Sequence, residues 1–109
     1  MGEKGSKLTE TASKTAETIV SKLSAISNIS SRRMFGGYGI FHDGKMFGLI
    51  NSKGELFFKV DDTNRSEYLQ LGSHQHLKMP YYSVPDKEFE DNSRLTELAK
   101  LSIAIAHKD

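Results

Sequence analysis

The chain contains no cysteine. That absence excludes disulfide bonds, thiolate metal sites and cysteine nucleophiles together. The sequence also lacks any run of about 18 consecutive apolar residues, the length that a membrane-spanning helix needs. Its first ten residues, MGEKGSKLTE, hold no apolar segment and no small-residue cleavage site, so we expect no secretory signal. These absences predict a protein of the reducing cytoplasm.

A strong excess of charge of either sign is lacking as well. The 109 residues include 15 lysines and arginines against 14 aspartates and glutamates, a formal net charge of +1. Proteins that bind a nucleic-acid backbone usually carry a clear basic excess. Direct nucleic-acid binding is therefore possible but not favoured. The length fits one compact domain, which we assign to residues 8–109, and we expect residues 1–7 to be frayed.

Proline is absent before residue 80, and the stretch RRMFGGYGIFHDGKMFGLI, residues 32–50, mixes glycines with large apolar side chains. The Asp43-Gly44 pair between apolar runs predicts a two-residue hairpin turn. That turn sets a register in which residues 37–42 face residues 45–50 one to one. One face of the hairpin then carries three close-packing glycines, Gly37, Gly39 and Gly48. We expect them to form a trough that receives the backbone of the first helix, with a small-molecule ligand as the alternative occupant.

Hydrophobic periodicity predicts the remaining elements. Apolar residues recur every three or four positions from Leu8 to Ile26, which is typical of a helix. Period-two patterns predict three strands, at about 34–42, 45–50 and 55–60. A short helix through Leu71, two short strands within 73–84 and a last helix from about Asn92 follow. The order helix–three strands–helix–two strands–helix indicates an α+β fold, a single two-layer domain with a five-stranded, mainly antiparallel sheet.

Three separated blocks follow one another along the chain: RRMFGGYGIFHDGKMFGLI, GELFFKVDDTNRSEYLQLG and MPYYSVPDKEFED. From about Leu8 to Ala106 the sequence resembles the N-terminal domain of the TfoX/Sxy regulators of bacterial natural competence. The resemblance implies a cytoplasmic, non-enzymatic regulator that raises transcription of DNA-uptake genes together with the cyclic-AMP receptor protein. It also implies a fold grouped with the secretion-chaperone-like α+β domains. Full-length members carry a second, helical domain, so this sequence is either an excised domain or a stand-alone relative.

Six residues in or near these blocks are candidate partner-binding positions: Arg32, Arg33, Asn64, Arg65, Tyr81 and Tyr82. The two arginines precede the predicted strand and would point to opposite faces; their guanidinium groups suit phosphate or carboxylate recognition, and simple solvent exposure is the alternative. Asn64 and Arg65 fall in the first turn of the short helix, where capping or a bridge to a neighbouring aspartate is the structural alternative. The tyrosine pair could stack on bases, although core packing explains strand aromatics equally well.

No constellation for catalysis is recognisable in the sequence. There is no serine elbow, phosphate loop or metal-ligand spacing, and Asp61-Asp62 occupies a helix start, where capping is a sufficient role. His74 and His76 would project from the same side of a strand, but a metal would need further ligands there. We therefore expect no catalytic residue, no metal and no cofactor.

The favoured hypothesis is a non-enzymatic module that works through protein–protein contact. We expect a homodimer whose interface uses exposed apolar sheet surface, because both faces of the predicted hairpin are apolar. One alternative is a DNA-binding domain that uses Arg32, Arg33 and the lysines of the first helix. The other is a small-molecule sensor that uses the glycine trough.

Overall fold

The computed structural model describes residues 3–34 and 36–108, with the side chains of these residues from Thr11 onward. The elements in chain order are α1 (Glu3–Lys22), β1 (Ile29–Met34), β2 (Gly37–His42), β3 (Lys45–Ile50), β4 (Leu56–Lys59), α2 (Arg65–Gln70), β5 (Tyr81–Ser83), α3 (Asp86–Glu90) and α4 (Asn92–Lys108). The strands form one antiparallel sheet in the order β1-β2-β3-β4-β5. The predicted α+β class with a five-stranded antiparallel sheet is confirmed.

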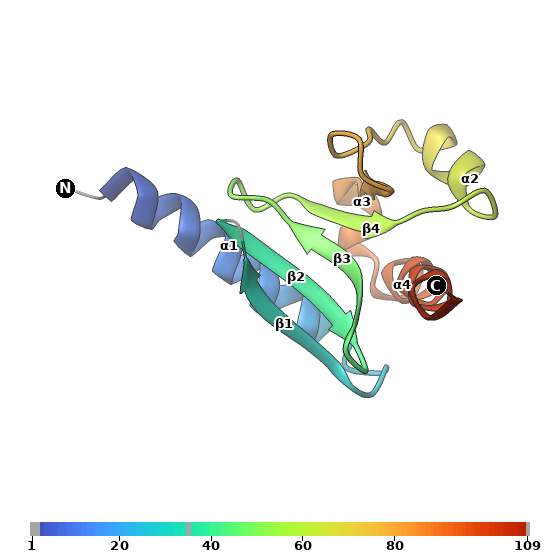
Figure 1. Ribbon diagram of the computed structural model, residues 1–109, viewed down its shortest axis with the longest axis horizontal. Coiled ribbons are helices and arrows are strands. Elements are labelled where there is room, and N and C mark those ends of the chain that lie inside the picture. Colours follow the sequence, from blue (N-terminus) through green and yellow to red (C-terminus); the bar gives the residue numbers. More distant parts are fainter. Residues whose placement is uncertain (1–2, 35, 109) are drawn as a thin grey trace.

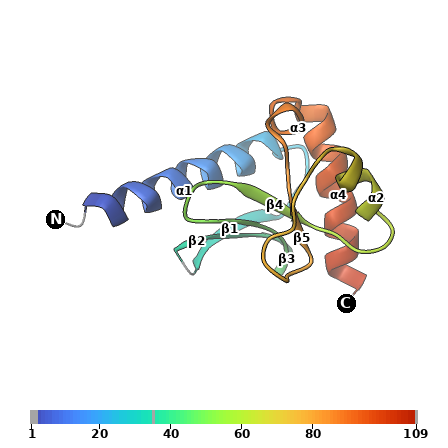
Figure 2. The same cartoon turned by 90° about the horizontal axis from the view of Figure 1, so that it is seen from above.

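The helices and the sheet form two layers (Figure 1). α1 and α4 pack against the same face of the sheet, and none of the described helices covers the opposite face (Figure 2). That opposite face is called the open face below. Within the described part of the chain, no helix combines the length and the apolar character needed to cross a bilayer.

The main core lies between the helices and the sheet. α1 contributes Ala12, Ala16 and Ile19, and Leu23 follows directly after the helix. α4 contributes Leu95, Leu98, Ala99, Ile103 and Ala106. Burial of one large aliphatic side chain stabilises a fold by about 1.5–3 kcal/mol, so these two helix stripes anchor the layer. The predicted stripe of the first helix is confirmed from Ala12 to Ile19, while the side chain of Leu8 lies outside the described ones. The helix ends at Lys22, so the prediction that it continues to Ile26 is wrong. The last helix begins at Asn92, as predicted.

The hairpin turn forms as predicted, but the strand register does not continue as predicted. Asp43 and Gly44 both have positive φ, 49° and 81°, as a two-residue turn of this kind requires. A register shift then falls between Ile40 and Phe41, and from there Ile40 pairs with Gly48. The predicted one-to-one register is therefore wrong beyond the first two pairs, because an extra residue in one strand slides every later pair.

The shifted register separates the three glycines, so the predicted trough for a helix is wrong. Gly48 pairs with the core residue Ile40 and faces the helix layer, and a Cβ there would lie 3.1 Å from the Phe58 ring. A Cβ on Gly39 would instead meet two methionine sulfurs on the open face. A Cβ on Gly37 would lie 1.9 Å from the carbonyl oxygen of Ile50. The close neighbours of these glycines are strand residues rather than helix backbone.

The close approach between α1 and the sheet occurs at another glycine, Gly54, in the β3–β4 turn. Its φ is +86°, and a Cβ there would lie 2.7 Å from the Cγ2 atom of Thr11. The hydroxyl of Thr15 donates to the Gly54 carbonyl at 3.0 Å. α1 is therefore joined to the turn by direct contact with its backbone.

Two strand assignments differ from the sequence prediction. Residues 29–34 form β1, although their polar sequence ISSRRM shows no alternation of apolar and polar positions. Residues 73–84 contribute one strand, β5, and an isolated bridge between Gln75 and Tyr82, rather than two strands. Four strands therefore precede α2 and one follows it.

Candidate interaction surface

β1 is an outer strand of the sheet and carries both candidate arginines. Arg32 pairs with Gly39 and Arg33 pairs with Tyr38, so their side chains leave the strand on opposite faces. Both arginines are exposed. The prediction that they precede the strand is wrong, because the strand begins at Ile29. They are thus held on a regular edge strand and not on a loop.

Arg32 belongs to a small cluster on the open face. Its guanidinium carbon lies 4.8 Å from the centroid of the Phe41 ring. The sulfurs of Met34 and Met46 lie over Gly39, within 3 Å of the place where a Cβ would stand. Phe41 is only 9 % exposed although no described helix covers it, because its own neighbours shield the ring. A cation–π contact at an exposed site contributes about 0.5–1 kcal/mol, so Arg32 is held loosely and its charge stays available.

The other half of the open face is closed by residues that follow α2. The ring centroids of His74 and His76 lie 5.6 and 4.7 Å from the ring centroid of Phe57, a residue that is only 1 % exposed. Tyr81 is 4 % exposed, and its hydroxyl donates to the carbonyl of Met46 at 3.5 Å. The histidine pair packs against an aromatic ring, and no group of three histidines or carboxylates in the described residues could hold a metal ion. Tyr81 is a packing residue with little surface to offer a partner.

The remaining candidates lie around α2. Tyr82 packs against the core, 6.3 Å from the Tyr68 ring between centroids. Arg65 contacts Asp62. Its hydrogen bond to Asp62, and to a smaller extent one to Tyr82, raises the pKa of Arg65 above its ordinary value. Arg65 is therefore a permanent cation that is already engaged within the chain.

Asn64 is buried, with 3 % of its surface exposed. Its Oδ1 atom accepts the N–H of Asp61 at 2.9 Å, and its Nδ2 atom donates to the carbonyl of Lys59 at 3.3 Å. These bonds shape the loop between β4 and α2. The six candidates thus divide among three places: the β1 edge, the open face and the α2 region.

An ion-pair cluster that sequence patterns did not reveal joins three helices. Arg94 of α4 contacts Glu67 of α2, Glu88 of α3 at 3.7 Å and Glu97 of its own helix at 3.4 Å. The hydrogen bond to Glu67 is the main reason that the pKa of Arg94 is raised. Because three carboxylates already surround this guanidinium, its role is to hold the helices together.

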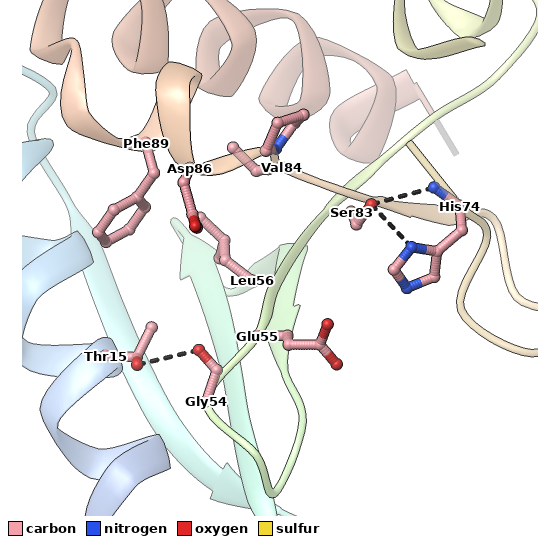
Figure 3. Close-up of a pocket in the computed structure, with 10 residues that line it drawn as sticks. Thr15, Gly54, Glu55, Leu56, His74, Ser83, Val84, Asp86 and Phe89 are labelled. Atoms are coloured by element: carbon pink, nitrogen blue, oxygen red, sulfur yellow. Dashed lines mark hydrogen bonds between the residues drawn. The ribbon is translucent and has the colours of Figure 1, made fainter. Parts of the chain in front are cut away.

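A cleft of about 370 Å³ opens between α1, the β3–β4 turn, the end of β5 and α3. Figure 3 shows Asp86 and Phe89 at one side of it and His74 at the other. The Ser83 hydroxyl lies 3.3 Å from His74 Nδ1, the spacing of a possible nucleophile and base. The same hydroxyl accepts the backbone N–H of His74 at 3.0 Å, and no carboxylate of the described residues hydrogen-bonds the His74 ring. The contact therefore closes the segment between these two residues and does not resemble a triad.

Comparison with known protein families adds a decisive match. The model of the TfoX N-terminal domain matches residues 21–106. The chain belongs to the TfoX N-terminal domain family. This family is linked to natural competence. The matched range includes the whole sheet, α2, α3 and all but the last two residues of α4, but only the last two residues of α1. No curated protein matches the chain.

Proposed function

We propose that this TfoX N-terminal domain is a non-enzymatic, cytoplasmic module that regulates competence genes through protein–protein contacts. The cyclic-AMP receptor protein is the candidate partner. The observation that carries the proposal is the exposure of Arg32 and Arg33 on β1, since both arginines belong to the first of the three sequence blocks that carry the family resemblance. A charged pair held on a regular strand presents a defined surface to a partner.

Charge supports a protein partner over a nucleic-acid backbone. The net charge is +1, and the two arginines leave β1 on opposite faces instead of forming one basic stripe. A phosphate backbone is best met by several cations on one surface. Direct DNA binding is therefore the competing function and becomes one arm of the test.

A co-precipitation experiment tests the proposal. The tagged chain is offered purified cyclic-AMP receptor protein, RNA polymerase or competence-promoter DNA, each alone and at two salt concentrations. We expect one of the two proteins to be retained, and we expect Arg33→Glu to reduce that retention. Lys53→Glu, which makes the same charge change at the exposed β3–β4 turn, is the matched control and should have no effect. If only the DNA is retained, and its retention falls steeply as the salt concentration rises, direct DNA binding would replace this proposal.

Self-association is the second part of the proposal. Met34, Met46 and Leu49 are half-buried on strands whose open face is not covered by a helix, so a second copy could cover them. Light scattering of the purified protein should give a mass above that of the 12.2 kDa chain at high micromolar concentration. A constant monomer mass under these conditions would remove the homodimer from the proposal.

A further inference from the structure

The outer edge of β1 carries backbone groups that no described strand satisfies. β1 borders the sheet, and Figure 1 shows no other strand beyond it. At the turn end of the β1–β2 ladder, the N–H of Asp43 donates to the carbonyl of Asn28 at 3.2 Å. Along an antiparallel pair, residues that bond across the ladder alternate with residues whose N–H and C=O point away. By this alternation, the residues that point outward are Ile29, Ser31 and Arg33.

β1 also lacks most of the devices that protect an edge strand. It has six residues, no proline and no register shift against β2, and Ser30 to Arg33 are all exposed. Its remaining protection is the charge of two arginines. If a second copy paired antiparallel about Ser31, the two Arg32 side chains would lie diagonally across the new pair, at the spacing where like charges repel. Charge repulsion therefore disfavours pairing of β1 with a second copy in this register, whereas an acidic strand would be attracted.

We propose that β1 accepts an extended acidic segment of a partner protein as a sixth strand of the sheet. The inference rests on the proposed function, since it names the surface and the chemistry of the partner. Backbone hydrogen bonds to the outward groups would hold the segment, and side chains at alternate positions would select it. Because Arg32 and Arg33 project from opposite faces of β1, two neighbouring acidic residues of the segment would pair with them, one on each face of the sheet. Apolar residues would suit the positions opposite Ile29 and Met34, which are half-buried.

A labelled peptide containing Val-Glu-Glu-Thr-Thr-Val tests this pattern. Paired antiparallel, it places its glutamates opposite Arg33 and Arg32 and its valines opposite Met34 and Ile29. The isomer Val-Glu-Thr-Glu-Thr-Val has the same composition but sets both glutamates on one face. Fluorescence anisotropy should show saturable binding of the first peptide and roughly threefold weaker binding of the isomer, because one exposed ion pair is lost.

Variants of the full chain locate the binding site. The double change Arg32→Glu with Arg33→Glu should weaken binding at least about tenfold, since two attractions become repulsions. Ser31→Pro removes an outward N–H at the centre of the edge, where proline is tolerated, and should weaken binding by roughly tenfold. Lys53→Glu is the control and should change the dissociation constant less than about twofold. Amide spectra of each variant establish that it remains folded.

Amide exchange of the labelled protein gives the deciding readout. We expect added peptide to slow exchange at Ile29, Ser31 and Arg33 while leaving their neighbours unchanged. Three results would overturn the proposal: peptide binding that the β1 variants do not change, slowed amide exchange around the cleft and not along β1, or no binding at millimolar peptide. If these amides became protected without peptide as the protein concentration rises, a second copy of the chain would occupy the edge, and this result would also overturn the proposal. If the peptide fails while co-precipitation still retains a partner, only the edge-strand proposal falls; if the peptide binds but no protein is retained, the proposed function falls.

Discussion

Replacing Gly54 by alanine tests how α1 is joined to the sheet. Two effects add at this position. The φ of +86° disfavours any L side chain, which costs about 1–2 kcal/mol. The new Cβ would also stand 2.7 Å from Thr11 Cγ2 and 3.1 Å from Thr15 Oγ1, and overpacking of this kind costs about 1–3 kcal/mol. The free energy of unfolding should therefore fall by about 2–5 kcal/mol.

Gly72→Ala is the matched control for this prediction. Its φ is +78°, close to that of Gly54, but no atom lies within 4 Å of the position of its Cβ. The free energy of unfolding of Gly72→Ala should fall only by the cost of the positive φ, about 1–2 kcal/mol. Urea denaturation followed by circular dichroism gives both free energies, provided that the slopes agree. Equal losses in the two variants would refute the close contact between α1 and the turn.

A second substitution separates contact from backbone strain. Thr11→Ser removes only the Cγ2 methyl group that meets the new Cβ. In the Gly54→Ala background it should recover part of the loss, and in the native background it should not stabilise the protein. A double-mutant cycle measures this coupling. No recovery would mean that the Thr11 methyl group contributes nothing to the loss, which would then come from the backbone angle and the contact with Thr15.

The other predictions concern the strand glycines and one carboxylate. Gly37→Ala should destabilise the fold more than Gly39→Ala, because the Ile50 carbonyl at 1.9 Å cannot move aside as methionine sulfurs can; comparable melting temperatures would contradict this. The pKa of Asp61 is lowered, mainly by hydrogen bonds from Thr63, so its contribution to stability is present above its unfolded-state pKa and is lost as the pH falls through the lower folded value. Thr63→Val should raise the pKa of Asp61 toward its ordinary value, and a carboxyl titration by NMR that shows no change would oppose the assignment.

Periodicity and turn chemistry were enough to predict the layers of this fold. The apolar stripe of α1, the start of α4 and the Asp43-Gly44 turn are local signals and formed where they were predicted, although α1 ends at Lys22 and not at Ile26. The register shift between Ile40 and Phe41 left no local signal, since apolar side chains occupy both faces of the hairpin. A slip of one residue then moved Gly48 to the helix side.

The candidate site was predicted only in part for a related physical reason. β1 is exposed on both faces, so its sequence has no alternation that could reveal a strand. Arg32 and Arg33 were found because of their chemistry, while their place on an edge depends on pairing with β2. Gly54 followed a recognisable turn, but its contact with α1 joins residues far apart in the chain. Contacts of that kind arise from packing rather than from local pattern.

Hydrogen exchange of the free protein measures directly whether β1 is an unpaired edge that presents both arginines. We expect amide protection to alternate along this strand at low protein concentration. Amides of Ile29, Ser31 and Arg33 should exchange at nearly unprotected rates, while those of Ser30 and Arg32 should be slowed by their bonds to β2. Uniform protection of all five amides at every concentration would show that the chain itself already covers this edge, and that β1 is not free to pair.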